Sequence, residues 1–437
     1  MTVAPMRLEP AAPAIAPAAT LSSLLGSFIL AAMVLHPTLL WPLIEAPAPP
    51  PSAMADFIPA APDQQSGPLN RLYFPAMLLF SLLAFALNRA GRLSSFATVS
   101  LALLIANLGW ALYSTTWSVE PGITLRRGLM LTIIAAAVAL AANACGAWRR
   151  GFNAIFLALA LVAALNLVAL VIKPPTPLGH AGIYPHKNVL GGVAACILMV
   201  SLSRAAQGPF VLRVLGAGTA LVAMLLLVVS NSKTSIGLGI LAPVVGLTLV
   251  AITRGARLTP ALSIPAGVFA LGGLYAMGAG LRLWDFGAVA KTLFGDPTLT
   301  QRTDIWAFAM QKIAQAPWRG YGYEAFWGAG FNSPSLREGP GFVAKMPQGH
   351  NGYIDLLLAG GIPAAALFAF LLFAVMAGIG RLVARDAVAG WLALTLFVFM
   401  LGYNMFETAY MRGFSLFSLM FLIVMALVSW TPRAGGR

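Results

Sequence analysis

Residues 356–380 run without a single charged side chain, and apolar blocks of this kind recur along the whole chain. A block of about 20 such residues is long enough for a helix to cross the hydrocarbon core of a bilayer. Hydrophobic residues make up 59% of the chain and charged residues only 9%, too few to cover a water-soluble surface. Because backbone polar groups in a bilayer must be satisfied internally, the sequence predicts an all-α, polytopic transmembrane helix bundle.

The apolar blocks divide the chain into three regions. Residues 1–280 are expected to hold nine transmembrane helices joined by short loops, residues 281–349 a large polar loop, and residues 350–437 three more helices. A second long connection, residues 44–70, is rich in proline and is interpreted as a semi-extended lid or edge segment. The sequence thus predicts about twelve spans, centred near Ile29, Leu79, Leu103, Ala136, Leu161, Cys196, Leu225, Val244, Val268, Phe370, Leu396 and Phe421.

The connections on alternate sides of these spans differ in charge. On one side every connection carries two arginines and almost no acid, as the positive-inside rule requires of cytoplasmic loops. This orientation places both termini in the cytoplasm and the loop of residues 281–349 at the outer face. The arginine pairs are Arg89 and Arg92, Arg149 and Arg150, Arg204 and Arg213, Arg254 and Arg257, Arg381 and Arg385, and Arg433 and Arg437.

The outer side carries many cations that topology does not require. Basic residues gathered at one face predict a strongly anionic ligand, such as a phosphate-bearing membrane lipid. For scattered members such as Lys291, contact with anionic headgroups is the alternative. The net charge of +14 does not indicate nucleic acid, which outer cations do not meet. The same side holds all four histidines: His36, His180, His186 and His350.

Within the outer loop, the run QRTDIWAFAMQKIAQ predicts an amphipathic helix with Thr303 or Asp304 capping its start. Arg302 stands just before that helix, so its guanidinium and the exposed amides converge into a cradle for a phosphate group. Pairing of Arg302 with Asp304 or with a lipid headgroup is an equal alternative. The apolar stripe of the helix is Ile305, Phe308, Ala309 and Ile313.

The run YGYEAFW follows the predicted helix and supplies Tyr321, Tyr323 and Trp327. Aromatic rings at an outer boundary form interface belts, and stacking against sugars is the sharper alternative. Glu324 is one of few outer carboxylates. It is interpreted as a hydrogen-bonding group for sugar hydroxyls or as a partner of Arg319.

Further cations stand at outer helix boundaries beside Asn, Ser and Thr. These are Lys187, which follows His186, and Lys233; Arg126 and Arg127 lie on the same side. Any one of them is explained by snorkelling to the interface. Together they predict a site that closes around a pyrophosphate.

The motifs that the chain lacks narrow the chemistry. It has no phosphate-binding G-x-x-x-x-G-K-[ST] loop, no D-x-D pair to bridge a metal to a sugar nucleotide, and no H-E-x-x-H or Cys cluster for zinc. The sequence therefore predicts neither a metal nor another cofactor. The centres of the spans carry no acid, which disfavours ion-coupled transport.

At QRTDIW, PWRGYGYEAFW and HNGYIDLLLAGGIP, with YPHKNVLGG and SNSKTS upstream, the chain resembles the O-antigen ligase and polymerase superfamily. The likeness spans about residues 100–425 and is strongest to the exopolysaccharide polymerases of Gram-negative bacteria. It implies a metal-independent, inverting glycosyltransferase of the bacterial inner membrane. The donor would be a glycan on undecaprenyl pyrophosphate, used at the periplasmic face.

The resemblance also implies roles for individual residues. His350 matches the essential histidine of the superfamily and Arg302 its essential loop arginine. Lys233 stands where ligases often have arginine, which favours a polymerase. The basic positions that vary more are matched by Lys187 and by Arg126 or Arg127.

These assignments lead to a mechanism hypothesis. His350 removes the proton of the acceptor hydroxyl, while Arg302, Lys233 and Lys187 stabilise the departing pyrophosphate. Asn351 is expected to orient either the histidine or the acceptor. Without the resemblance, the simpler reading of His350 is a hydrogen bond at a helix start.

Two other functions compete with polymerisation of lipid-linked repeat units. A ligase would pass the glycan to lipid A-core by the same chemistry. A flippase for lipid-linked oligosaccharides would also need outer cations, but it would line the spans with polar residues through to the cytoplasmic side.

Overall fold

The computed structural model describes residues 17–44, 67–88, 99–146, 148–283, 285–294, 301–413 and 415–429. Within these ranges the chain forms no β-strand, and all regular structure is helical. The proline-rich segment predicted to act as a lid lies, except for its ends, outside the described residues. The helices are α1 (Pro17–Leu35), η1 (His36–Leu40), α2 (Trp41–Ile44), α3 (Pro68–Leu87), α4 (Val99–Tyr113), η5 (Ser114–Thr116), α5 (Pro121–Cys145), α6 (Trp148–Ile172), α7 (Lys187–Ala206), α8 (Phe210–Val229), α9 (Lys233–Gly255), α10 (Pro260–Gly280), α11 (Phe286–Phe294), α12 (Arg302–Gln315), α13 (Pro334–Glu338), η6 (Gly341–Lys345), α14 (Gly352–Arg385), α15 (Ala387–Tyr403) and α16 (Leu416–Ser429).

The twelve predicted spans correspond to helices. Ten described stretches have the length and hydropathy to cross a membrane, the first of them formed by α1, η1 and α2 together. The shorter apolar helices α15 and α16 complete the set. Each predicted span centre lies inside one of these helices, so the prediction of an all-α polytopic bundle is confirmed.

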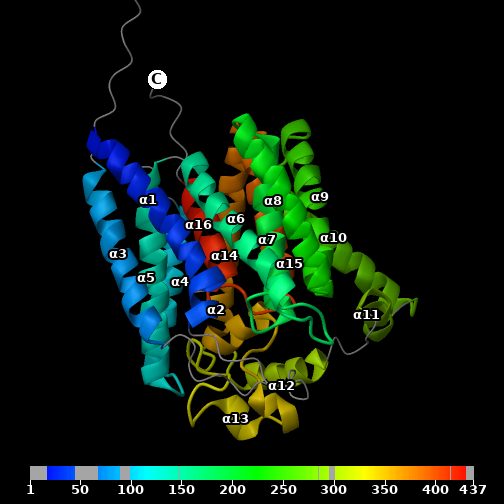
Figure 1. Ribbon diagram of the computed structural model, residues 1–437. Helices are drawn as coiled ribbons and strands as arrows, with labels where there is room; N and C mark the ends of the chain where they lie inside the picture. The colour runs from blue at the N-terminus through cyan, green and yellow to red at the C-terminus, as the bar shows by residue number, and fades with distance from the viewer. Residues whose placement is uncertain are drawn as a thin grey trace, which may run out of the picture.

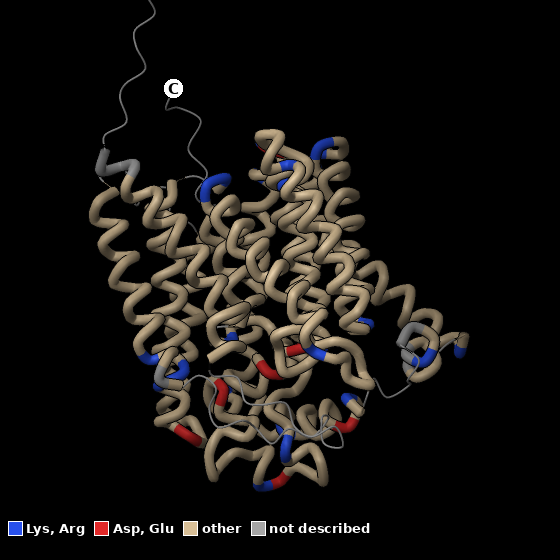
Figure 2. Tube along the Cα trace, in the orientation of Figure 1, with Lys and Arg blue, Asp and Glu red and all other residues tan. Residues whose placement is uncertain are grey.

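The long helices run side by side, with their connections at two ends (Figure 1). One end carries the start of α1 and the end of α16, and the other end carries α12 and α13. Basic residues mark both ends and leave the middle of the bundle uncharged (Figure 2). We call the end with the start of α1 and the end of α16 the terminal end, and the end with α12 and α13 the loop end. The predicted arginine pairs at the terminal end are described except for Arg89, Arg92, Arg433 and Arg437, which lie outside the described residues.

The core of the bundle lies around α5, α7, α15 and α16. Leu419–Val428 of α16 is buried on every side, in agreement with a helix that is apolar all round. Thirteen residues of α7 are buried as well. In contrast, α10 is almost wholly exposed: only 6% of its apolar window is buried within the described protein.

A kink in α14 prepares the docking of the outer loop. Gly361 has φ +67° and ψ −165°, a conformation that only glycine adopts at low cost, and Pro363 follows it. A Cβ at Gly361 would lie 2.4 Å from the carbonyl carbon of Trp318. The sequence GGIP therefore both breaks the helix and lets the loop approach its backbone.

The kink frees backbone groups that the loop then occupies. The Ile362 amide donates to the Pro317 carbonyl at 2.8 Å, and the Leu358 carbonyl accepts from the Tyr321 amide at 2.7 Å. On its other side, the loop is joined to the α4–α5 turn, where the Trp117 indole donates to the Arg319 carbonyl at 2.8 Å. The described part of the outer loop is thus held in place by hydrogen bonds to its main chain.

The loop has a small apolar core of its own. It is built on the predicted stripe of α12, and all four stripe residues are buried. Around α12 pack the rings of Phe326 and Trp327, the latter 6.4 Å from Phe308 between ring centroids. This packing fixes α12, and with it Arg302, against the end of the bundle.

Candidate functional site

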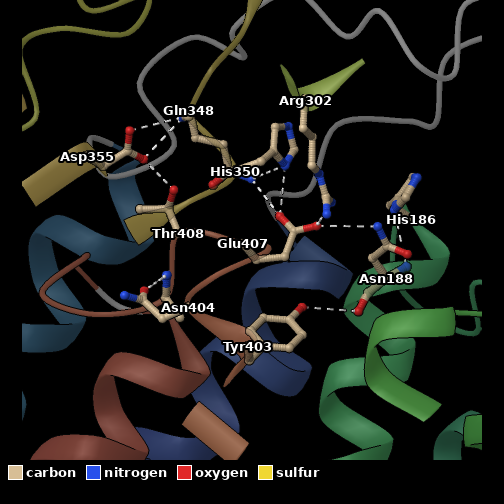
Figure 3. A network of polar contacts seen from close by, with 12 residues as sticks. His186, Asn188, Arg302, Gln348, His350, Asp355, Tyr403, Asn404, Glu407 and Thr408 are labelled. Atoms are coloured by element: carbon tan, nitrogen blue, oxygen red, sulfur yellow. Dashed lines mark hydrogen bonds and ion pairs between the residues drawn. The ribbon is translucent and has the colours of Figure 1, made fainter. Parts of the chain in front are cut away.

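The carboxylate of Glu407 is the centre of a polar network at the loop end (Figure 3). Glu407 lies between α15 and α16, and its side chain is 13% exposed. Its Oε1 accepts from the Arg302 guanidinium at 2.9 Å and from the side-chain amide of Asn188 at 3.4 Å. Its Oε2 accepts from Gln348 Nε2 at 3.0 Å and lies 3.0 Å from His350 Nδ1. Four segments far apart in the sequence therefore meet at one group.

The electrostatics of this network favour a permanently ionised Glu407. Burial by itself raises the pKa of the carboxyl, because the charge loses its hydration. The charge and hydrogen bond of His350 and the charges of Arg302 and His186 outweigh burial and lower the pKa to about 2. Glu407 is thus a fixed negative charge across the physiological pH range.

Arg302 is placed by the start of α12, but not by the cap that the sequence suggested. The prediction that Thr303 or Asp304 caps this helix is wrong, because Gln301 is the N-cap and no side chain caps the start. Gln301 takes a left-handed conformation with φ +64°, and the helix begins at Arg302, before the start that a cap at Thr303 or Asp304 would give. The guanidinium contacts Glu407, whereas Asp304 is exposed.

The hydrogen bonds around His350 select one proton arrangement of its ring. Arg412 donates to Gln348 Oε1, so the amide of Gln348 presents its NH₂ group to Glu407. A carboxylate only accepts hydrogen bonds, and therefore the His350 Nδ1 that lies 3.0 Å from Oε2 must carry a proton. In the neutral ring, the lone pair then belongs to Nε2.

Asn351 acts on the backbone. Its side-chain oxygen accepts from the amides of Tyr353 at 3.0 Å and Ile354 at 3.2 Å, and so it caps α14. The helix-start bond that was considered for His350 belongs to Asn351. Asn351 thereby fixes the turn that directly follows His350, whose own backbone is left-handed with φ +49°.

Asp355 secures the segment that carries His350. Its carboxylate accepts from the Trp327 indole at 2.7 Å and from the Gly349 amide at 3.1 Å, and Thr408 donates to it as well. All three of these donors are neutral groups. Asp355 thus ties the outer loop, α14 and the α15–α16 connection together.

We expect Asp355→Ala to loosen this junction, because it leaves three donors without their acceptor at a cost of about 1–3 kcal/mol for each donor that stays buried. Amide hydrogen exchange at Gly349 should become faster, and the midpoint of thermal unfolding should fall. Asp304→Ala is the matched control, since Asp304 also lies in the first turn of a helix but is exposed. Equal exchange at Gly349 in both variants would contradict this assignment.

The start of α7 lies beside the network. His186 caps this helix by accepting from the backbone amide of Asn188 at 3.1 Å. The charge of His186 also helps to lower the pKa of Glu407. Lys187 donates to the carbonyls of Leu178 at 3.0 Å and Asn231 at 3.4 Å. The predicted pyrophosphate ligand Lys187 therefore also clamps two neighbouring connections.

Lys233 is exposed at the first residue of α9. The starts of α7 and α9 are packed together: a Cβ added to Gly191 would lie 2.6 Å from the Ser232 side chain. Lys187 and Lys233 consequently stand on adjoining helix ends, both with helix N-termini that favour anions.

Two predicted cations lie at the start of α5. Arg127 bonds the Glu324 backbone carbonyl at 2.5 Å, and its Nε is 3.8 Å from the carboxylate of that residue. The ion pair seen for Glu324 is thus with Arg127, whereas the sequence suggested Arg319. Arg126 is exposed at the same helix start. The Arg127–Glu324 contact joins α5 to the outer loop.

The predicted aromatic platform contributes mainly to packing. Tyr323 is 5% exposed and donates to the Met411 carbonyl at 2.6 Å. Tyr321 donates to the Lys312 carbonyl at 2.8 Å. Of the three predicted rings, Tyr323 is closed off from a ligand in this conformation, and Trp327 is bound to Asp355.

Sequence reasoning missed Glu407, Gln348 and Asn188. Of these three, Glu407 would have been the easiest to predict from the sequence. Acids are sparse on the outer side, and this one lies in a short connection between apolar blocks. Its partners are 57 and 105 residues away along the chain, so no local motif joins them. In the described part of the chain, no group of three His, Cys, Asp or Glu residues is arranged to hold a metal ion.

Comparison with known proteins agrees with this geometry. A family model described as O-antigen ligase matches residues 189–369. The exopolysaccharide production protein ExoQ of Rhizobium meliloti (strain 1021) is 29% identical over 290 residues, which cover 62% of this chain and 63% of the relative. The chain thus spans somewhat less than two thirds of that relative. Together with the helical topology, the two matches show that this chain is similar to the O-antigen ligase and polymerase superfamily.

Proposed function

We propose that the protein is a glycosyltransferase that polymerises lipid-linked repeat units of a surface polysaccharide. The donor is a glycan on undecaprenyl pyrophosphate, and the acceptor is a sugar hydroxyl of a second lipid-linked unit. The site faces the periplasm of the bacterial inner membrane, because the positive-inside rule assigns the terminal end, which carries the arginine pairs, to the cytoplasm.

One observation carries this proposal: His350 and Arg302 contact opposite oxygens of the same buried carboxylate. A ring with a lone pair on Nε2 and a guanidinium are thereby held at a fixed separation. The first is suited to accept a proton and the second to balance an anion.

The transfer is a single displacement with inversion. The acceptor oxygen attacks the anomeric carbon of the donor sugar, and its proton passes to His350 Nε2. The bond between that carbon and the pyrophosphate oxygen breaks, and the electron pair leaves with the lipid pyrophosphate. Arg302, Lys187 and Lys233 stabilise the negative charge that develops on this leaving group.

A polymerase is favoured over a ligase for two reasons. The curated relative is named for exopolysaccharide production. In addition, Lys233 stands where ligases often carry arginine. Both reactions use the same donor and the same base, so they differ in the acceptor alone.

The purified protein should extend a synthetic polyprenyl-pyrophosphate-linked repeat unit into a ladder of longer chains. We expect the ladder to form in EDTA and without any nucleotide, because no step uses a metal or a nucleotide sugar. Gel electrophoresis of a fluorescent donor measures the products. Supplying lipid A-core as a competing acceptor distinguishes the two activities, and transfer to lipid A-core without a ladder would show a ligase.

A further inference from the structure

A cavity of about 230 Å³ opens at the terminal end, between the start of α6, the end of α7 and the α7–α8 connection. It lies far from the site of Glu407. Lys187 and Arg204 stand at opposite ends of α7, about 25 Å apart at 1.5 Å per helical residue. The cavity is therefore separate from the site of the proposed transfer.

Two guanidinium groups, those of Arg149 and Arg204, line this cavity. Arg149 bonds Asp386 at 2.7 Å and lies over the ring of Trp148 at 5.4 Å. Arg204 donates to the neutral oxygens of Asn153 and Gln207. Its Nε is buried and has no acceptor among the described residues. Within the described part of the chain, Asp386 is the one acid that pairs with these two guanidinium groups, so the cavity has an excess of positive charge.

The lining changes with depth. The polar residues come from the helix ends, where Ser203 also faces the cavity. Further along α6 and α7, towards the middle of the bundle, the lining is apolar and includes Phe156 and Val200. Trp148 stands at the boundary, a position typical of aromatic residues at a membrane surface.

We propose that this cavity binds the phosphate group of an anionic phospholipid headgroup at the surface opposite to the transfer site. The guanidinium groups and Ser203 take the phosphate oxygens. The apolar residues beneath contact the glycerol and the first acyl carbons. The cavity is smaller than the roughly 300–1,000 Å³ of pockets that enclose whole drug-sized ligands, which fits a headgroup whose chains stay in the bilayer.

The test measures the thermal unfolding midpoint of the purified protein in detergent during titration with phosphatidylglycerol, phosphatidylcholine or inorganic phosphate. Phosphatidylglycerol should stabilise the wild-type protein more than phosphatidylcholine does. In Arg204→Gln, the concentration that gives half of this effect should rise by about tenfold, the loss expected for one charge-assisted bond. Arg149→Gln should act in the same direction and is safe for folding, because 65% of the Arg149 side chain is exposed.

Arg213→Gln is the matched control. Arg213 belongs to the same basic end but is exposed and bonds the Ala205 carbonyl at 3.3 Å outside the cavity lining. If inorganic phosphate alone reproduces the stabilisation and the same two variants abolish it, the phosphate site stands and its ligand is soluble. If phosphatidylglycerol stabilises all three variants as it does the wild-type protein, or stabilises none of the four, the proposal is overturned.

Discussion

Replacing His350 with alanine is expected to reduce glycosyl transfer by roughly 10²–10⁴-fold, the usual contribution of a general base. A sugar hydroxyl is a weak nucleophile, and among the described residues His350 is the imidazole that contacts Glu407, through Oε2. Its loss removes the proton acceptor without changing Arg302. The rate should therefore fall while binding of the donor persists, which initial rates at several donor concentrations measure as a lower kcat at similar KM.

His180→Ala is the control for this variant. His180 lies at the same end, where it bonds the Lys173 carbonyl at 2.9 Å and accepts from the Gly182 amide at 2.9 Å. These bonds are confined to the α6–α7 connection, so this variant is expected to lose stability but to keep its rate per folded molecule. Added imidazole should partly restore transfer in His350→Ala. Full activity of purified His350→Ala would refute the assignment of the base.

The positions of the spans were predictable because they depend on local properties. A helix in a bilayer needs a long uncharged block, and such blocks can be counted along a sequence. The apolar stripe of α12 was predictable for the same reason, since residues three or four apart share a face of one helix. The kink at Gly361 was not predicted. Its role in docking the outer loop depends on the approach of Trp318 from a distant segment.

The interior of the site depends on distant residues and was predicted only in part. His350 and Arg302 were singled out, and the structure brings both to one group. That group, Glu407, was not anticipated, because its four partners lie on three segments that are far apart in the sequence. Conversely, the sequence could not show that Tyr323 would be buried or that Arg127 would pair with Glu324, since both outcomes follow from the docking of the loop on α5.

Glu407→Gln is expected to lower kcat nearly as much as the loss of His350. The two side chains have the same shape, but the glutamine must present an NH₂ group on one side. If its oxygen keeps the bond to Arg302, its NH₂ faces His350 Nδ1. Nδ1 then has to accept, the proton moves to Nε2, and the ring can no longer act as a base. A comparable change of tautomer in the serine protease triad costs about 10⁴-fold.

The pattern of kinetic effects separates this positioning role from simple damage. The donor KM should change little, because Arg302 keeps an acceptor, and Glu407→Asp should recover part of the rate because it restores an acceptor for Nδ1–H. Any acidic limb of the rate–pH profile between pH 5 and 8 cannot come from Glu407, whose pKa is lowered to about 2. A Glu407→Gln enzyme with the wild-type kcat would show that the ring does not depend on this carboxylate.

The stability of the same variant follows from the sign of the pKa change. A carboxyl group whose pKa falls from 4.5 to about 2 on folding stabilises the protein fully above pH 4.5, and this contribution is lost as the pH falls towards 2. Glu407→Gln lacks that contribution at every pH. The wild-type protein should therefore unfold at a higher temperature than the variant near pH 7, and the difference should shrink as the pH is lowered from 4.5. A difference that stays constant down to pH 3 would mean that the charge of Glu407 does not stabilise the junction of the loop and the bundle, and that its effect on kcat acts through hydrogen-bond geometry alone.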